Sequence, residues 1–130
     1  RHYGDLQGKT IALWGLAFKA ETDDMREATS LVTIRHLLEA GCTVRVFDPA
    51  AMDEARRRLG DAVIYASDIY DAAKGADALL LLTEWKQFRL PSWARVHDLM
   101  RSPIVFDGRN IYDPAEMRKN GFEYYSIGRK

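Results

Sequence analysis

Short apolar segments alternate with amphipathic segments along nearly the whole chain, and this alternation constrains the fold more than any other feature. The segments predicted as strands are 9–14, 43–47, 62–65, 78–82, 104–106 and 124–127. The segments predicted as helices are 29–40, 52–59, 68–74, 92–100 and 114–119. Strands that alternate with helices of about ten residues indicate βαβ crossovers and a mostly parallel sheet. We therefore expect a single doubly wound α/β domain with helices on both faces of the sheet.

Two of these segments carry the clearest signals. Apolar residues recur at helical intervals in 29–40, where we expect Ser30 to cap the helix and Gly41 to follow its last turn. The run Ala78–Leu82 is entirely apolar, which is typical of a central strand buried on both faces. Asn120 and Gly121 predict a turn before the last strand.

The composition is that of an ordinary globular protein and argues against several function classes. The 130 residues suffice for one domain with one sizeable core. Lysine plus arginine number 19, as do aspartate plus glutamate, so no net charge attracts nucleic acid or an anionic membrane. No apolar run reaches the roughly 18 residues of a spanning helix, and the single cysteine cannot form an internal disulfide. We expect a cytoplasmic setting with no nucleic-acid or membrane partner.

The sequence predicts neither a metal site nor a catalytic nucleophile. His2, His36 and His97 lie far apart, and no cysteine or second histidine stands at the spacing of metal ligands. Cys42 precedes a strand with no histidine nearby, so we expect it to be a small, inert core residue. Neither G-x-S-x-G nor a P-loop occurs, which removes the clearest signals of hydrolases and kinases.

Ligands of doubly wound, Rossmann-like sheets bind outside the carboxyl ends of the strands. The loops expected there are Gly15–Thr29, Asp48–Met52, Thr83–Pro91 and Asp107–Asp113. The first loop has a single glycine and lacks the G-x-G-x-x-G of a dinucleotide turn. It instead gathers charged residues that could meet phosphate or sugar hydroxyls, namely Lys19, Asp23, Asp24, Arg26 and Glu27. Residue types alone favour a solvated, self-paired loop over a binding loop.

The two later loops also have a binding and a structural interpretation. Arg109 follows a strand and a glycine, where a guanidinium could bridge a phosphate or lie on a base. Alternatively, this loop is only a turn, with Gly108 supplying conformational freedom and Asn110 and Asp113 capping. The segment 83–89 combines a carboxylate with two aromatic residues, for which we favour packing on the rim of the sheet over ligand stacking.

Four motifs occur together and in order at these loops. They are GLAFKAETDDMRE at 15–27, FDPAA at 47–51, LLLLTEW at 79–85 and FDGRNIYD at 106–113. With them the chain resembles, from about Gly8 to Arg129, the C-terminal domain of the UDP-glucose/GDP-mannose dehydrogenase family. The TDDMRE, TEW and DGRN segments look most like its UDP-glucose 6-dehydrogenase branch. We expect residues 1–7 to be an N-terminal stub and 8–130 to be the UDP-sugar-binding domain.

The resemblance implies an NAD-dependent oxidation of UDP-glucose to UDP-glucuronate through a cysteine-bound thiohemiacetal. Carried over residue by residue, it implies that Phe18, Lys19 and Arg109 contact the substrate and that Arg26 reaches NAD. The family's N-terminal NAD-binding domain, central helical region and catalytic cysteine have no counterpart in this sequence. We therefore expect no catalytic residue here, an inactive fragment, and the missing domains of the same enzyme as partners.

A second class of function stays open. The chain could be a stand-alone nucleotide-sugar binding or assembly module that never had a catalytic half. A coding sequence that extends upstream through a glycine-rich βαβ unit would support the dehydrogenase domain, and a start codon near Arg1 would support the module. The chain begins a few residues before its first predicted strand, which is typical of an excised domain or a proteolytic remnant.

Overall fold

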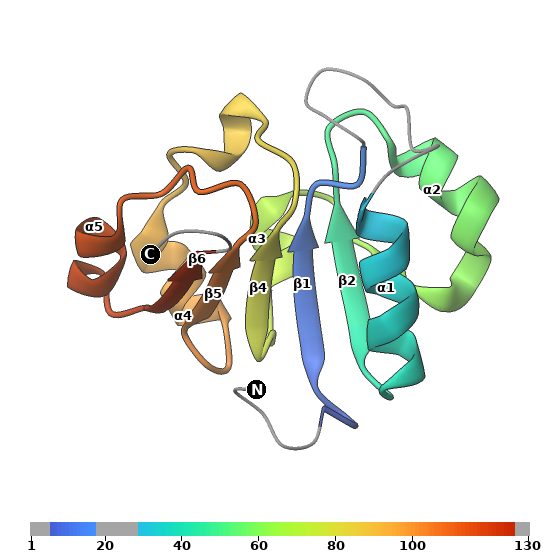
Figure 1. Cartoon of the computed structure of the whole chain (residues 1–130), viewed down its shortest axis with the longest axis horizontal. Helices are drawn as coiled ribbons and strands as arrows, with labels where there is room; N and C mark the ends of the chain where they lie inside the picture. Colours follow the sequence, from blue (N-terminus) through green and yellow to red (C-terminus); the bar gives the residue numbers. More distant parts are fainter. Residues whose placement is uncertain (1–5, 18–28, 127–130) are drawn as a thin grey trace.

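The computed structural model describes residues 6–17 and 29–126, and these form one parallel sheet covered by helices (Figure 1). The strands are β1 (Thr10–Trp14), β2 (Thr43–Phe47), β3 (Ile64–Tyr65), β4 (Ala78–Leu81), β5 (Ile104–Asp107) and β6 (Glu123–Ser126). The helices are α1 (Thr29–Glu39), α2 (Met52–Leu59), α3 (Ile69–Ala73), α4 (Trp93–Leu99) and α5 (Pro114–Lys119). Two short 3₁₀ helices, η1 (Gly60–Ala62) and η2 (Lys86–Phe88), follow α2 and β4.

The strand order is β3-β2-β1-β4-β5-β6, and every neighbouring pair is parallel. The chain winds outward from β1 to β3 and then outward the other way from β4 to β6. The winding direction therefore reverses between the two central strands, β1 and β4. This confirms the predicted doubly wound α/β fold and marks the switch point at which such folds bind ligands.

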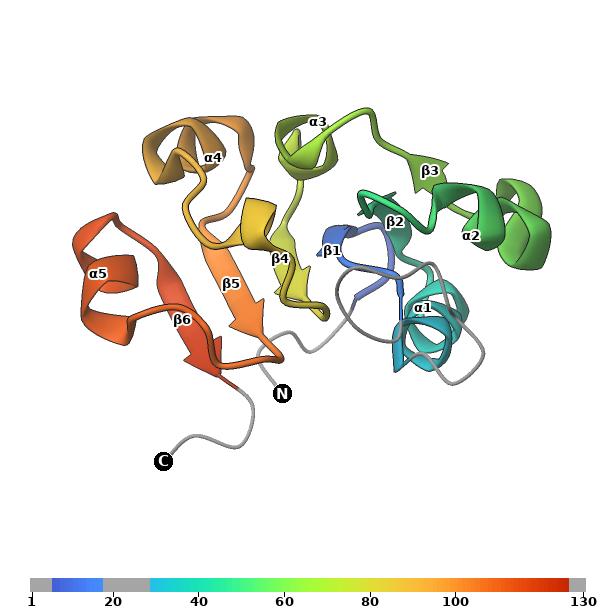
Figure 2. The same ribbon diagram turned by 90° about the horizontal axis from the view of Figure 1, so that it is seen from above.

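Helices cover both faces of the sheet, as Figure 2 shows from above. On one face, α1 and α2 pack on a cluster that includes Ile11 and Leu13 of β1. On the other face, α3, α4 and α5 pack on a cluster that includes Ala12 and Trp14. Successive side chains of a strand point to opposite faces, so the run of buried residues in β1 serves both layers.

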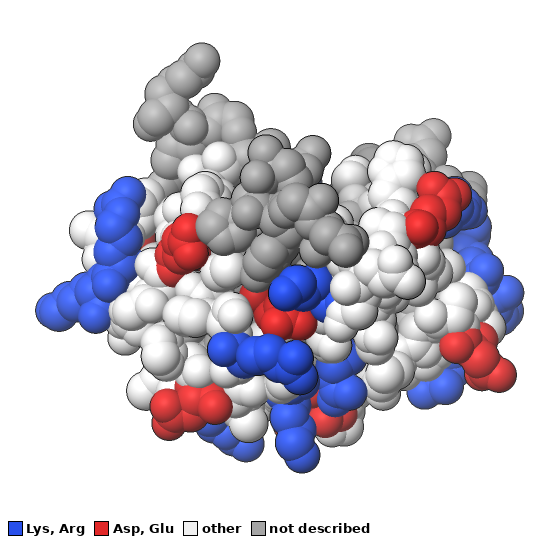
Figure 3. Space-filling view, turned by 90° about the horizontal axis from the view of Figure 1, so that it is seen from below, with Lys and Arg blue, Asp and Glu red and all other residues white. Residues whose placement is uncertain are grey.

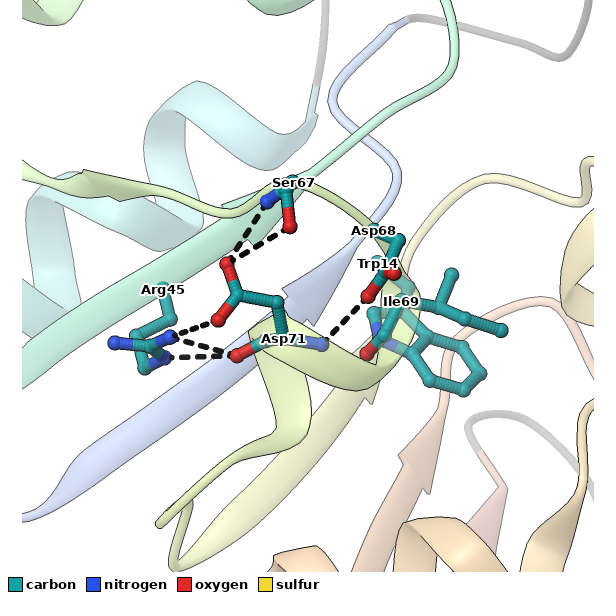
Figure 4. A network of polar contacts seen from close by, with 6 residues as sticks. All are labelled: Trp14, Arg45, Ser67, Asp68, Ile69 and Asp71. Carbon is teal, nitrogen blue, oxygen red and sulfur yellow. Dashed lines mark hydrogen bonds and ion pairs between the residues drawn. The ribbon is translucent and has the colours of Figure 1, made fainter.

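A polar network ties the start of α3 to the sheet (Figure 4). Asp68 caps the helix by accepting the Asp71 N–H at 2.7 Å. Asp71 accepts the Ser67 N–H at 2.9 Å and receives the Arg45 guanidinium from β2 at 3.0 Å. On the opposite side, the indole N–H of Trp14 donates to the carbonyl of Ile69 at 3.1 Å. Two strands thereby fix the orientation of a helix of only five residues.

The element predictions are confirmed within a few residues, with two local corrections. Ser30 is not the helix cap, because it is the second residue of α1 and its hydroxyl donates to the Leu16 carbonyl at 2.6 Å. The third strand is shorter than predicted, since the chain first makes the η1 turn and β3 pairs with β2 only from Ile64. The predicted turn at Gly121 is confirmed by its φ of 89°.

Charges of both signs are interspersed over the surface that lies at the amino ends of the strands (Figure 3). This distribution agrees with the equal numbers of acidic and basic residues in the sequence. None of the helices in the described part of the chain combines the length and the apolar character needed to cross a membrane.

Candidate functional site

The carboxyl ends of β1, β2, β4 and β5 meet at one edge of the sheet, at the top of Figure 1. At the switch point the turn after β1 lies directly against the turn after β4. A Cβ atom on Gly15 would lie 2.6 Å from the Thr83 backbone nitrogen, and the φ of Gly15 is 101°. Only glycine satisfies both constraints without strain. The first and third loops of the site therefore begin in close contact.

Asp48, at the end of β2, holds the described part of the first turn. Asp48 is only 1% exposed. One carboxylate oxygen, Oδ2, accepts the N–H groups of Leu16 at 2.7 Å and Ala17 at 3.0 Å, and the indole N–H of Trp85 at 3.3 Å. The other oxygen accepts the N–H groups of Ala50 and Ala51 at 2.8 and 2.9 Å. One buried carboxylate thereby links three loops.

The carbonyls of the same turn are also bound. The hydroxyl of Thr83, a residue that is 1% exposed, donates to the Ala17 carbonyl at 2.8 Å. Ser30 donates to the Leu16 carbonyl from α1. Both backbone polar groups of Ala17 therefore have buried partners, immediately before Phe18 and Lys19 in the sequence.

Asp107, at the end of β5, organises the fourth loop in the same way. Its two carboxylate oxygens accept four consecutive backbone N–H groups, from Arg109 to Tyr112, at 2.7 to 3.0 Å. The hydroxyl of Tyr124 donates to the same carboxylate at 2.7 Å. Within this loop Asn110, not Gly108, has the left-handed conformation, with a φ of 59°. Gly108 is needed for space instead, because a Cβ there would lie 2.8 Å from the Leu81 carbonyl oxygen.

Arg109 projects from this loop into an ion-pair cluster with the third loop. Its Nη2 lies 3.2 Å from Glu84 Oε1, and its side chain is 42% exposed. Arg89 lies 3.7 Å from the other oxygen of Glu84. Two guanidinium groups thus share one carboxylate, which leaves this cluster with a net positive charge beside the switch point. A phosphate could join such a cluster through charge-assisted hydrogen bonds.

The aromatic residues of the third loop pack on the rim of the sheet, as predicted. Phe88 is fully buried, and Trp85 is partly buried with its N–H on Asp48. The hydroxyl of Tyr112 donates to the Phe88 carbonyl and so joins the third and fourth loops. Burial, and then the Asp107 carboxylate, raises the pKa of Tyr112 far above its ordinary value. Tyr112 therefore stays a protonated donor at neutral pH.

The structure places only one of the four predicted site residues. Arg109 lies at the carboxyl edge, where the sequence placed it. Phe18, Lys19 and Arg26 lie outside the described residues, as do Asp23, Asp24 and Glu27 of the same charged segment. Cys42 is a buried core residue on the amino side of β2, away from this edge, as predicted. Within residues 6–17 and 29–126, no group of three His, Cys, Asp or Glu side chains could hold a metal ion.

The described part of the first turn does not fit a dinucleotide. A dinucleotide-binding turn offers its backbone N–H groups to a pyrophosphate. Here the N–H groups of Leu16 and Ala17 already donate to Asp48, so a pyrophosphate at this turn would meet a carboxylate. We therefore assign no NAD contact to residues 15–17.

Sequence reasoning missed the residues that build the site rather than face a ligand. Asp48, Thr83 and Asp107 are all almost completely buried. The available signal was position, since each stands at the carboxyl end of a predicted strand and two are followed by proline or glycine. A short polar side chain at such a place can form hydrogen bonds with the backbone groups of a nearby turn.

Comparison with known protein families agrees with the resemblance that the motifs indicate. A family model described as "UDP-glucose/GDP-mannose dehydrogenase family, UDP binding domain" matches residues 12–114. The chain is 50% identical over 131 residues to the UDP-glucose 6-dehydrogenase of Pseudomonas aeruginosa, which covers 97% of this chain and 29% of the relative. It is 46% identical over 127 residues to the UDP-glucose 6-dehydrogenase YwqF of Bacillus subtilis, covering 98% and 29%. The chain thus spans less than a third of the length of these relatives.

Solved structures give the same result. The UDP-glucose dehydrogenase of Pyrobaculum islandicum superposes with a TM-score of 0.78 at 34% identity, over 94% of this chain and 26% of that chain. The NDP-N-acetyl-D-galactosaminuronic acid dehydrogenase of Methanosarcina mazei gives a TM-score of 0.83 at 26% identity, over 97% and 26%. The motifs, the fold and these matches agree, and the chain belongs to the UDP-binding domains of the UDP-glucose/GDP-mannose dehydrogenase family.

Proposed function

We propose that this chain is the UDP-sugar-binding domain of an NAD-dependent UDP-glucose 6-dehydrogenase, which oxidises UDP-glucose to UDP-glucuronate. The observation that carries the proposal is the cationic cluster of Arg109 and Arg89 around Glu84, beside the switch point. Its place in the fold is where doubly wound domains bind ligands. The names of the relatives at 50% and 46% identity support UDP-glucose as the substrate.

In this proposal, Phe18, Lys19 and Arg109 contact the nucleotide sugar. Arg109 is already oriented, because Asp107 holds its backbone N–H and Glu84 holds its guanidinium. Lys19 follows the anchored residue Ala17 by two positions. Together a lysine and an arginine could neutralise a diphosphate. We assign Arg26 to NAD, and the main NAD site and the catalytic cysteine to parts of the complete enzyme outside this sequence.

Titration of the isotopically labelled chain with UDP-glucose tests the substrate assignment. Each charge-assisted hydrogen bond contributes on the order of 1.5–3 kcal/mol, so a few such bonds on one wall of a cleft give a dissociation constant of roughly a millimolar. We expect NMR shifts at the carboxyl edge, weakened by salt and lost in Lys19→Ala and Arg109→Ala. NAD alone should cause little or no shift.

Arg118→Ala is the matched control, because it removes one positive charge from an exposed position in the last turn of α5. This variant should bind as the unsubstituted chain does. Shifts that fall away from residues 15–29 and 107–113, or that survive both site substitutions unchanged, would contradict the assignment.

A further inference from the structure

We propose that the segment Thr83–Trp85 positions two described parts of the proposed nucleotide-sugar site. Thr83 and Trp85 orient the turn at residues 15–17, and Glu84 orients Arg109. The inference rests on the proposed function for its ligand, and it adds three positioning residues that do not themselves have to touch that ligand.

The first step is that Thr83 and Trp85 converge on one residue, Ala17. Thr83 donates its hydroxyl to the Ala17 carbonyl at 2.8 Å. Trp85 donates its indole N–H to Asp48 Oδ2, the same oxygen that accepts the Ala17 N–H at 3.0 Å. The carbonyl of Ala17 is thus held directly and its N–H through one carboxylate oxygen. The two hydrogen bonds that Ala17 itself makes are buried, where hydrogen bonds restrict geometry most strongly, and the Trp85–Asp48 contact is partly buried.

The second step is that Glu84, between these two residues, makes its contacts elsewhere. Its carboxylate lies 3.2 Å from both the Nε and the Nη2 atoms of Arg109. The contacts themselves divide the segment. Thr83 and Trp85 serve the first loop through Ala17 and Asp48, while Glu84 serves the fourth loop through Arg109.

The third step concerns what Glu84 does to the affinity for an anion. A carboxylate beside Arg109 opposes a phosphate electrostatically, but it also holds the guanidinium in one place. Arg109 and Glu84 side chains are 42% and 39% exposed, so water screens the repulsion between Glu84 and a ligand. A positioning role and a merely competing role therefore predict opposite signs when the charge of Glu84 is removed.

Amide hydrogen exchange of the free chain tests the first loop without any ligand. In Trp85→Phe an aromatic ring is kept, although a smaller one, and the indole N–H donor is lost, so Leu16 and Ala17, which share Asp48 Oδ2 with Trp85, should exchange about two- to ten-fold faster. Ala50 and Ala51, on the other oxygen, should keep their protection. Unchanged exchange at Ala17, or an equal loss at all four amides, would overturn the role of Trp85.

Binding of UDP-glucose to the same variants tests the site as a whole. Thr83→Val, Trp85→Phe and Glu84→Gln should each weaken binding about two- to ten-fold, whereas Thr83→Ser, which keeps the hydroxyl, should stay within about two-fold. Gln87→Ala, an exposed substitution in the same loop, is the matched control and should bind as the unsubstituted chain does. The melting temperature of each variant is measured, and binding is compared at the same number of degrees below it.

The two levels of failure are distinguishable. Tighter binding by Glu84→Gln would show simple competition with the ligand and would overturn the role of Glu84. Equal binding by Thr83→Val and Thr83→Ser would overturn that of Thr83. No binding by the unsubstituted chain would instead contradict the proposed function, and the exchange experiment would still decide whether Trp85 positions the turn.

Discussion

Asp48 and Asp107 use buried carboxylates to hold backbone rather than to face solvent. Each accepts four backbone N–H groups and one side-chain donor, from Trp85 and Tyr124 respectively. Burying a charge is costly unless it is fully hydrogen-bonded, and these two are. At the scale of single residues, the shape of the carboxyl edge therefore depends on two side chains that need not touch any ligand.

Gly15→Ala should strongly destabilise the fold. The positive φ alone costs about 1–3 kcal/mol for a residue with a side chain, and the added Cβ would lie 2.6 Å from the Thr83 backbone nitrogen. Gly75→Ala is the matched control, because Gly75 has a φ of 73° with no heavy atom within 4 Å of the added Cβ. Denaturant unfolding should show a larger loss for Gly15→Ala, and equal losses would contradict the close contact.

Cys42 should react slowly with alkylating reagents in the folded chain. The residue is 6% exposed, and its thiol donates to the Leu6 carbonyl at 3.5 Å. Burial, and then the Asp77 carboxylate, raises the pKa of the Cys42 thiol, and the thiolate is the reactive form. Mass spectrometry after iodoacetamide treatment should detect modification only once denaturant is added. Rapid labelling of the native chain would show that Cys42 is accessible.

At the scale of elements, the network around α3 makes stability depend on pH. The hydrogen bond from the Ser67 backbone, and then the Arg45 guanidinium, lowers the pKa of Asp71 below the ordinary value of an aspartate. A carboxyl whose pKa is lowered by folding contributes stability above its unfolded pKa and loses that contribution as the pH falls through its folded pKa.

Asp71→Asn should therefore be less stable than the unsubstituted chain at neutral pH, with a smaller further loss between about pH 5 and pH 3. Urea unfolding at several pH values measures this difference. The control is Asp98→Asn, on the exposed side of α4, which should leave the pH dependence unchanged. Parallel pH profiles for Asp71→Asn and the unsubstituted chain would contradict the role of Asp71.

The sequence predicts the elements well because their signals are local. The apolar runs locate β1 and β4, and the helical period locates α1, almost to the residue, with glycines marking the ends of β1 and α1. Ser30 was misassigned as a cap because its hydroxyl meets Leu16, a partner from the preceding loop. Asn110 has the left-handed conformation expected of Gly108, and Gly108 is instead required for space beside Leu81 of the neighbouring strand. Contacts between distant segments are what a local pattern does not contain.

The candidate site is predictable in the same partial way. Arg109 follows from its place after a strand and from the family motif. The assignment of Glu84 to Arg109, and of Thr83 and Trp85 to the first turn, requires the strand order that brings β1, β4 and β5 together. The roles of Phe18, Lys19 and Arg26 stay predictions.

At the scale of the whole molecule, the proposed function makes the chain one part of a larger site. It spans 29% of the length of the two relatives described above. We predict that it produces no NADH from UDP-glucose and NAD, because hydride transfer needs a cofactor site and a positioned nucleophile that its motifs do not supply. A spectrophotometric assay against a protein-free control measures this, with an intact UDP-glucose 6-dehydrogenase as the positive control. Activity above the protein-free rate would contradict the prediction.

The carboxylate of Asp48 has a kinetic consequence for the turn at residues 15–17. The N–H groups of Leu16 and Ala17 already donate to this carboxylate, so this part of the turn is ordered without a ligand. The backbone of residues 15–17 does not have to rearrange on capture, so no slow conformational step arises from it. In the proposed site, we therefore expect differences in affinity among variants of the turn to appear mainly as differences in dissociation rate.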